Sequence, residues 1–145
     1  MAGHQIAIRR AGTGDLERLI ALDHRAATGD AVRLSLLRQS VDDGHCLVHT
    51  DPVAIDGFVL VRRRHFFERD FVDLLLVDPL ARRRGIGTAL MEAALHRAGS
   101  SQVFTSTNRS NGPMRGLLER TVWTFSGELD GLDEGDPELV YFKWR

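Results

Sequence analysis

Several features are scarce in this sequence of 145 residues, and each scarcity excludes a class of protein. The only cysteine is Cys46, so no disulfide can form within the chain, which excludes the disulfide framework of a small secreted domain. No stretch approaches the ~20 apolar residues of a membrane span, and the first residues lack the apolar core of a secretion signal. These absences predict a cytoplasmic protein, and its composition, 43% hydrophobic and 27% charged, is that of an ordinary globular domain.

Net charge is also nearly absent. There are 19 Lys and Arg residues against 20 Asp and Glu, a formal net charge of −1. Nothing in this balance requires a nucleic acid or a membrane surface as partner, and we expect neither. The charges are unevenly placed, however, because two arginine triplets, residues 62–64 and 82–84, lie in the middle of the chain. An acidic group near the end consists of Asp130, Asp133, Glu134 and Asp136.

The second arginine triplet belongs to a stretch that predicts a strand, a glycine-rich loop and a helix. An apolar run at residues 72–77 ends at Asp78-Pro79, and a helical pattern of apolar residues begins at Leu90. Between them, Gly85 and Gly87 allow the backbone to approach a ligand closely. The start of the helix leaves N–H groups unpaired, and its dipole favours negative charge. The stretch therefore predicts an anion site suited to a pyrophosphate.

Other glycine loops fit this stretch less well. A dinucleotide-binding loop requires a third glycine where this chain has Leu90, and a P-loop requires a lysine that is absent near the loop. A simpler alternative is a tight turn between strand and helix with solvated arginines. That alternative explains each residue separately but leaves their order unexplained.

The motif Arg82-x-x-Gly85-x-Gly87, preceded by Val77-Asp78-Pro79, resembles the acyl-CoA-binding motif of the GNAT superfamily of N-acetyltransferases. The resemblance implies an enzyme that moves an acetyl group from acetyl-CoA, as co-substrate, to a primary amine of a small molecule, peptide or protein. The resemblance is also compatible with a homodimer. The alternative is a non-catalytic module that binds acyl-CoA or regulates another protein.

The order of predicted elements over the whole chain is also that of a GNAT fold. We expect one domain, residues 1–145, of mixed α/β class, with about four helices on both faces of a mixed, mostly antiparallel sheet of about seven strands. The expected helices carry Leu19, Leu37, Met91 and Leu117. The residues between 63 and 70 are expected to form a connection. The expected strands cover residues 6–10, 45–50, 53–62, 72–77, 102–106, 123–129 and 139–143.

The resemblance also implies which residues hold the co-substrate. In the family, backbone groups of the fourth strand pair with the pantetheine arm, and the glycine loop holds the pyrophosphate. Amide side chains after the fifth strand are candidates for further contacts, although Asn111 is equally well explained as a helix cap. The expected co-substrate residues are Leu75, Leu76, Val77, Arg82, Arg83, Arg84, Gly85, Ile86, Gly87, Thr88, Asn108 and Asn111.

Acetyl transfer to an amine needs a base and a source of a proton for the departing thiolate. The candidate bases are Glu68, Asp70 and Asp73. Strand alternation places Asp73 on the face of Leu75, which favours it, whereas Glu68 and Asp70 are alternatively solvated loop charges. Many family members carry a tyrosine as the acid, but the corresponding residue here is Leu118. The family's acid is therefore not expected in this chain.

Weaker features leave further alternatives open. His45 and His49 share a strand face, but no third ligand stands at a suitable spacing, so no metal is expected. The triplet 62–64 with Phe66 and Phe67 fits either a nucleic-acid surface or a loop on the acceptor side of an acetyltransferase. The acidic group either attracts a cationic amine or forms an ordinary solvated turn.

Overall fold

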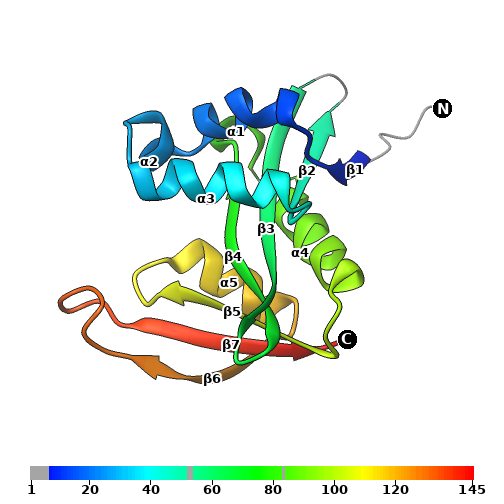
Figure 1. Ribbon diagram of the computed structural model, residues 1–145. Helices are drawn as coiled ribbons and strands as arrows, with labels where there is room; N and C mark the ends of the chain where they lie inside the picture. Colours follow the sequence, from blue (N-terminus) through cyan, green and yellow to red (C-terminus); the bar gives the residue numbers. More distant parts are fainter. Residues whose placement is uncertain (1–6, 52–53, 83) are drawn as a thin grey trace. The chain divides into compact units, whose positions relative to one another are not determined.

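The computed structural model describes residues 7–51, 54–82 and 84–145. Within these residues, seven strands form one mixed sheet in the order β1-β2-β3-β4-β5-β7-β6, which confirms the predicted fold class (Figure 1). The strands are β1 (Ala7–Arg10), β2 (Cys46–Asp51), β3 (Ala54–Phe66), β4 (Arg69–Val77), β5 (Gln102–Asn108), β6 (Thr124–Leu129) and β7 (Glu138–Trp144). The α-helices are α1 (Leu16–Leu22), α2 (His24–Ala27), α3 (Ala31–Asp42), α4 (Ile86–Arg97) and α5 (Gly112–Arg120), and two short 3₁₀ turns are η1 (Thr13–Asp15) and η2 (Pro79–Ala81).

The chain divides into two compact units. The first contains the described residues up to Val61 together with Leu74–Ala94, and the second contains Arg62–Asp73 and Leu95–Arg145. Strands β3 and β4 and helix α4 contribute residues to both. No helix in the described part of the chain is both long and apolar enough to cross a membrane.

The predicted connection over residues 63–70 is wrong. Strand β3 continues to Phe66 and β4 begins at Arg69, so the two strands are separated by only Phe67 and Glu68. These two residues have φ angles of 47° and 66°, and positive φ at both central residues is typical of the tight type I′ hairpin turn. The sequence lacks the asparagine or glycine that normally signals this turn, which is why the hairpin was not predicted. The one-turn helix α2 was also missed.

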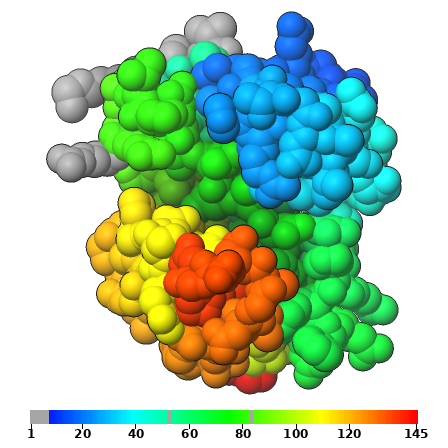
Figure 2. All heavy atoms as spheres, turned by 90° about the vertical axis from the view of Figure 1, so that its left-hand side faces the viewer, coloured from blue at the N-terminus to red at the C-terminus, as the bar shows by residue number. Residues whose placement is uncertain are grey.

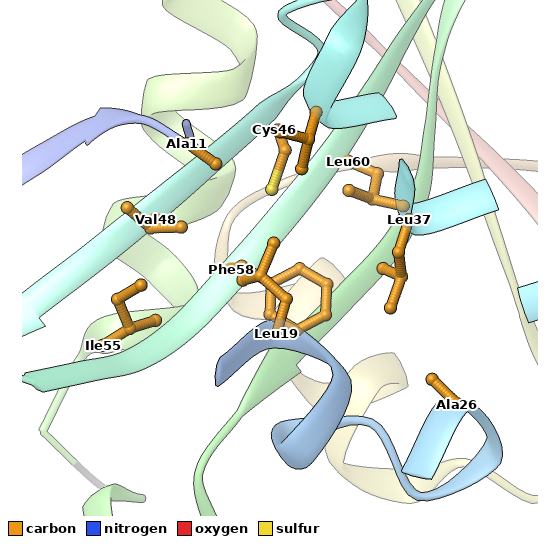
Figure 3. Packing of buried hydrophobic residues seen from close by; sticks show 10 residues of the cluster. Ala11, Leu19, Ala26, Leu37, Cys46, Val48, Ile55, Phe58 and Leu60 are labelled. Carbon is orange, nitrogen blue, oxygen red and sulfur yellow. The ribbon is translucent and has the colours of Figure 1, made fainter. Parts of the chain in front are cut away.

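In the first unit, helices α1 and α3 cover one face of antiparallel strands β1, β2 and β3. Alternate residues of each strand point toward these helices and bury their side chains. Figure 3 shows the resulting core, in which Leu19 and Leu37 of the helices pack with Val48, Phe58 and Leu60 of the strands. All five side chains are completely buried, so the helices and the strands share one close-packed interior.

Cys46 lies in this core and is fully buried (Figure 3). Burial raises the pKa of its thiol to about 12, because the charged thiolate is poorly solvated there. Since the thiolate is the reactive form, we expect Cys46 to resist a disulfide reagent such as DTNB at mildly alkaline pH while the protein is folded. A thiol count before and after unfolding in guanidinium chloride measures this. Equally rapid reaction in both states would contradict the burial.

Helix α4 covers the opposite face of the same strands. A Cβ atom added to Gly57 of β3 would lie 3.0 Å from the Leu76 carbonyl oxygen and 3.1 Å from side-chain atoms of both Ile86 and Leu90. Gly57 alternates with Phe58, so α4 lies on the face away from the core in Figure 3. The first unit therefore has helices on both faces, and the missing side chain at Gly57 allows the beginning of α4 to pack closely against β3.

In the second unit, the start of β4 pairs with β5 in parallel, and β5, β7 and β6 are antiparallel. The ladder of β4 and β5 joins Asp70–Val72 to Val103–Thr105. A row of aromatic rings crosses these strands, with centroids of neighbouring rings 5.0 to 5.6 Å apart. The row consists of Phe66, Phe71, Phe104 and Phe142. Phe66 thus packs against other aromatic side chains of its own unit, as an ordinary core residue does.

Candidate functional site

The glycine loop begins in a tightly bonded turn at the end of β4. The Asp78 N–H donates to the Asp56 carbonyl oxygen of β3 at 2.7 Å, and Asp78 Oδ1 accepts the Leu80 N–H at 3.0 Å. The carboxylate thereby caps η2, a role for which a short acid before proline is well suited. Arg82 then leads in an extended conformation into the loop.

The loop ends at Gly85, which has a φ of 76° and accepts the first hydrogen bond of α4, from the Ala89 N–H at 3.0 Å. Residues with a Cβ adopt this left-handed conformation only at a cost, so glycine is favoured here. No heavy atom lies within 4 Å of the place where a Cβ would stand. Gly85 therefore presents an exposed, open stretch of backbone at the start of the helix.

The donors of this loop face no competing negative charge on α4. The N–H groups of Ile86, Gly87 and Thr88 belong to the first turn, where an α-helix has no carbonyl partners of its own to offer. That turn contains no acidic residue, and the helix dipole makes it positive. The exposed guanidinium groups of Arg82 and Arg84 add charge. The loop is thus suited to an anion with several oxygens.

The other residues predicted for the loop differ in how they can contact a ligand. Arg83 lies outside the residues that the structure describes. The Ile86 side chain is buried, 4% exposed, so only its backbone can contact a ligand. Arg84 Nη1 lies 3.8 Å from Asp51 Oδ2, an ion pair whose arginine remains largely exposed.

The end of β4 supplies an apolar surface. Leu74 and Leu76 pack against the core of the first unit. Because side chains alternate along a strand, Leu75 and Val77 point away from that core, and both are half-buried. Leu75, Leu76 and Val77 form the end of β4 and lead directly to the turn that begins the glycine loop.

The three candidate bases have very different surroundings. Glu68 is an exposed turn residue. Asp70 is only 1% exposed, and its two carboxylate oxygens accept the Gly99 N–H at 2.7 Å and the Arg64 N–H at 3.1 Å. The interpretation of Asp70 as a solvated loop charge is therefore wrong. Its carboxylate is buried and engaged in holding two backbone segments together.

Asp73 is the half-buried member of the three. Its Oδ2 atom accepts from Arg62 Nη1 at 3.1 Å, and the same nitrogen lies 3.0 Å from His65 Nε2. A quarter of the Asp73 side chain is exposed, so solvent reaches the carboxylate. Among the three candidates, Asp73 is the one whose carboxylate is both held by a hydrogen bond and accessible to solvent.

The two candidate amides are engaged within the second unit. Asn111 Oδ1 accepts the Met114 N–H at 3.2 Å and caps α5, which confirms the interpretation as a helix cap. Asn108 Nδ2 donates to Asp133 Oδ2 at 2.9 Å, in the loop between β6 and β7. Figure 2 shows this loop in orange-red, against the yellow residues that follow β5.

Two members of the acidic group, Asp133 and Asp136, accept hydrogen bonds from residues that follow β5 or end it. Asp136 accepts from the hydroxyl and the N–H of Ser110, at 2.6 and 3.0 Å. These hydrogen bonds, the one from the hydroxyl first, lower the pKa of Asp136 below its usual range. The contacts of Asp133 and Asp136 support the interpretation as an ordinary turn, while Asp130 and Glu134 remain exposed.

Leu118 is completely buried, so the position of the family's tyrosine is filled by a core residue. The single tyrosine, Tyr141, is 5% exposed and its ring packs edge-on against Phe125. Among the described residues, His45 and His49 gain no third ligand for a metal. His49 Nδ1 lies 2.5 Å from Asp56 Oδ1, and the described residues contain no group of three or more side chains that could hold a metal ion.

A strand, a glycine loop and a helix in this order, on a mixed sheet of seven strands, form the arrangement found in acyl-CoA-dependent acyltransferases. The chain belongs to the acetyltransferase (GNAT) family, whose model matches residues 15–122. The predicted family and class of enzyme are thereby confirmed. No curated protein matches the sequence significantly.

Solved structures of the family have the same fold. A GNAT acetyltransferase from Bacillus cereus is 29% identical, with a TM-score of 0.89 over 97% of this chain and 98% of that one. The protein yncA from Salmonella typhimurium, solved with its cofactor acetyl-CoA, is 17% identical, with a TM-score of 0.76 over 97% and 94% of the chains. Diaminobutyrate acetyltransferase from Paenibacillus lautus, solved with L-2,4-diaminobutyric acid and coenzyme A, is 21% identical, with a TM-score of 0.74 over 96% and 95%.

Proposed function

We propose that this protein transfers the acetyl group of acetyl-CoA directly to a primary amine of a small molecule, peptide or protein. The observation that carries the proposal is the open backbone at Gly85, directly before a helix whose first turn is free of acidic residues. Family membership supplies the class of reaction. A similar fold accommodates an amino acid with a second amine in the Paenibacillus enzyme, which supports an amine as acceptor.

The residues present fit the co-substrate. The backbone of Arg82 and of residues 84–88, together with the guanidinium groups of Arg82 and Arg84 and the Thr88 hydroxyl, would hold the pyrophosphate. The backbone of Leu75, Leu76 and Val77 would hold the pantetheine arm. Acetyl-CoA supplies the acetyl group in activated form, as a thioester.

Transfer forms a bond between the amine nitrogen and the acetyl carbon and breaks the bond between that carbon and sulfur. The amine must be neutral to react, and the proton that it loses needs an acceptor. Asp73 is suited to this role because Arg62 orients its carboxylate while solvent still reaches it. The buried side chain of Leu118 has no acidic proton to donate, and we propose that the departing thiolate takes its proton from water.

Replacing Asp73 with asparagine should lower kcat by roughly a hundredfold, the usual contribution of a general base. An asparagine carbonyl still accepts the hydrogen bond from Arg62, so we expect the fold and the affinity for acetyl-CoA to remain. Steady-state kinetics with both substrates measure this, and Glu68→Gln, in the exposed turn of the same hairpin, is the control with unchanged kcat. Equal kcat in Asp73→Asn and wild type would exclude Asp73 as the base.

The proposed reaction is tested by release of the CoA thiol from acetyl-CoA in the presence of small amines, peptides and protein N-termini. DTNB reports the released thiol cleanly, because the only cysteine of the enzyme is buried. The expected result is release that depends on the amine, with an equal amount of acetylated product found by mass spectrometry. Binding of acetyl-CoA without transfer to any acceptor in a broad panel would instead indicate a non-catalytic acyl-CoA-binding module.

A further inference from the structure

Helix α1 is tied to the turn that begins the glycine loop by one side chain, that of Arg18. Its Nε donates to the Ile55 carbonyl oxygen of β3 at 3.0 Å, and its Nη2 donates to Asp78 Oδ2 at 3.1 Å. We call these two contacts the Arg18 clamp. All three residues belong to the first unit, which also contains the glycine loop.

Asp78 is the residue through which the clamp acts on the loop. Its N–H binds the Asp56 carbonyl oxygen, its Oδ1 accepts the Leu80 N–H, and its Oδ2 accepts from Arg18. The three bonds connect this single residue to β3, to its own turn and to α1. Both the backbone and the side chain of Asp78 are therefore fixed where β4 ends and the path toward Gly85 begins.

We propose that Arg18 is a positioning residue for acyl-CoA, which acts through Asp78 and holds the entrance of the glycine loop in the conformation that binds. The inference rests on the proposed function, because it needs the loop to be the acyl-CoA site. When only a fraction of molecules has the competent loop, the apparent dissociation constant rises as that fraction falls. Loss of the clamp thus weakens binding without removing any group that touches the ligand.

The expected size of the effect follows from the exposure of the pair. The side chains of Arg18 and Asp78 are 42% and 20% exposed, so solvent weakens their attraction. The second bond, to the Ile55 carbonyl, fixes the guanidinium plane and adds to the coupling. Together these features predict acetyl-CoA binding that is roughly three- to tenfold weaker when the clamp is lost.

The variants can be chosen so that they break the Arg18 clamp but keep the hydrogen bond from the Leu80 N–H to Asp78. Arg18→Met removes both donors and keeps an apolar stem of similar length. Asp78→Asn keeps an oxygen for the Leu80 N–H but presents an amide group to Arg18, so it breaks the clamp and preserves the cap. Arg18→Lys keeps the charge with a single head group and should lose part of the effect.

A matched control exists in the same unit. Arg25 also donates through Nε and Nη2, at 3.0 and 2.7 Å, but both nitrogens bind Asp30, at the start of α3. Arg25→Met therefore removes a guanidinium with two similar hydrogen bonds from a pair that does not include Asp78. We expect this variant to bind acetyl-CoA as wild type does.

Isothermal titration with acetyl-CoA, steady-state kinetics and urea unfolding together test the proposal. Arg18→Met and Asp78→Asn should each weaken binding and raise the KM for acetyl-CoA by the same roughly three- to tenfold factor, leaving the KM for the amine unchanged. The double variant should bind no more weakly than Arg18→Met, because both substitutions break the same contact between Arg18 and Asp78.

Unchanged affinity for acetyl-CoA in both single variants, with only the stability to urea reduced, would overturn the inference and leave Arg18 a structural residue. Multiplied losses in the double variant would overturn it as well, because the two residues would then act independently. Failure of the proposed function is recognised separately, since it appears as absence of acetyl-CoA binding in the wild-type protein.

Discussion

Replacement of Gly85 with valine is expected to weaken acetyl-CoA binding by roughly a hundredfold. Part of this loss is conformational, because a φ of 76° is strongly disfavoured for a β-branched residue and costs about 1–2 kcal/mol or more. The rest is steric. The valine side chain would occupy the open space beside the loop backbone, where a pyrophosphate has to approach the N–H groups of the first turn of α4.

A second glycine provides a control for the general loss of stability that such backbone strain causes. Gly131, in the loop between β6 and β7, has a φ of 91° and equally open surroundings, and it belongs to the other unit. Gly131→Val should therefore lose a similar amount of stability in urea and bind acetyl-CoA normally. Isothermal titration of both variants gives the comparison. Equal affinity in Gly85→Val and wild type would show that the loop does not hold the co-substrate.

Replacement of Asp70 with asparagine is expected to lower the free energy of unfolding by about 3 kcal/mol. Both carboxylate oxygens of Asp70 accept backbone N–H groups, and an amide can replace only one of them. The amide's own N–H₂ would face the remaining donor in a site that is 1% exposed, leaving both groups unsatisfied. Urea unfolding measures the loss.

The same variant decides between a structural and a catalytic role for Asp70. Because its carboxylate is engaged with Gly99 and Arg64, we expect kcat per folded molecule to be unchanged in Asp70→Asn. Glu68→Gln, in the exposed turn before the same strand, should alter neither stability nor kcat. A stable Asp70→Asn variant with greatly reduced kcat would contradict this and make Asp70, rather than Asp73, the base.

Most of the fold could be predicted from the sequence because its longer elements have clear periodicity. Helix α4 and strand β4 follow directly from their apolar patterns, and the Asp78-Pro79 turn marks their connection. The missed elements have no such pattern. A single helical turn such as α2 is too short to show periodicity, and the turn at Phe67 and Glu68 adopts positive φ without the residues that usually allow it.

The glycine loop was predictable for the same reason, since its motif is continuous in the sequence. The roles of the carboxylates could not be predicted, because they depend on partners that are distant in the sequence. Asp70 and Asp73 lie three residues apart in one strand, yet one binds the Gly99 N–H and the other Arg62. The contact between Arg18 and Asp78 spans 60 residues and has no spacing that could signal it. Gly57 did offer a signal, because an isolated glycine within a strand pattern indicates close approach of another backbone.

The proposed enzyme is tested most directly by titrating the wild-type protein with acetyl-CoA and then adding primary amines to the saturated complex. We predict one binding site per chain, followed by release of the CoA thiol and formation of an equal amount of acetylated amine. The Gly85→Val variant should need roughly a hundredfold more acetyl-CoA for the same binding and thiol release. Absence of binding in the wild-type protein, or thiol release that is as fast in Gly85→Val, would contradict the assignment of the glycine loop as the acyl-CoA site.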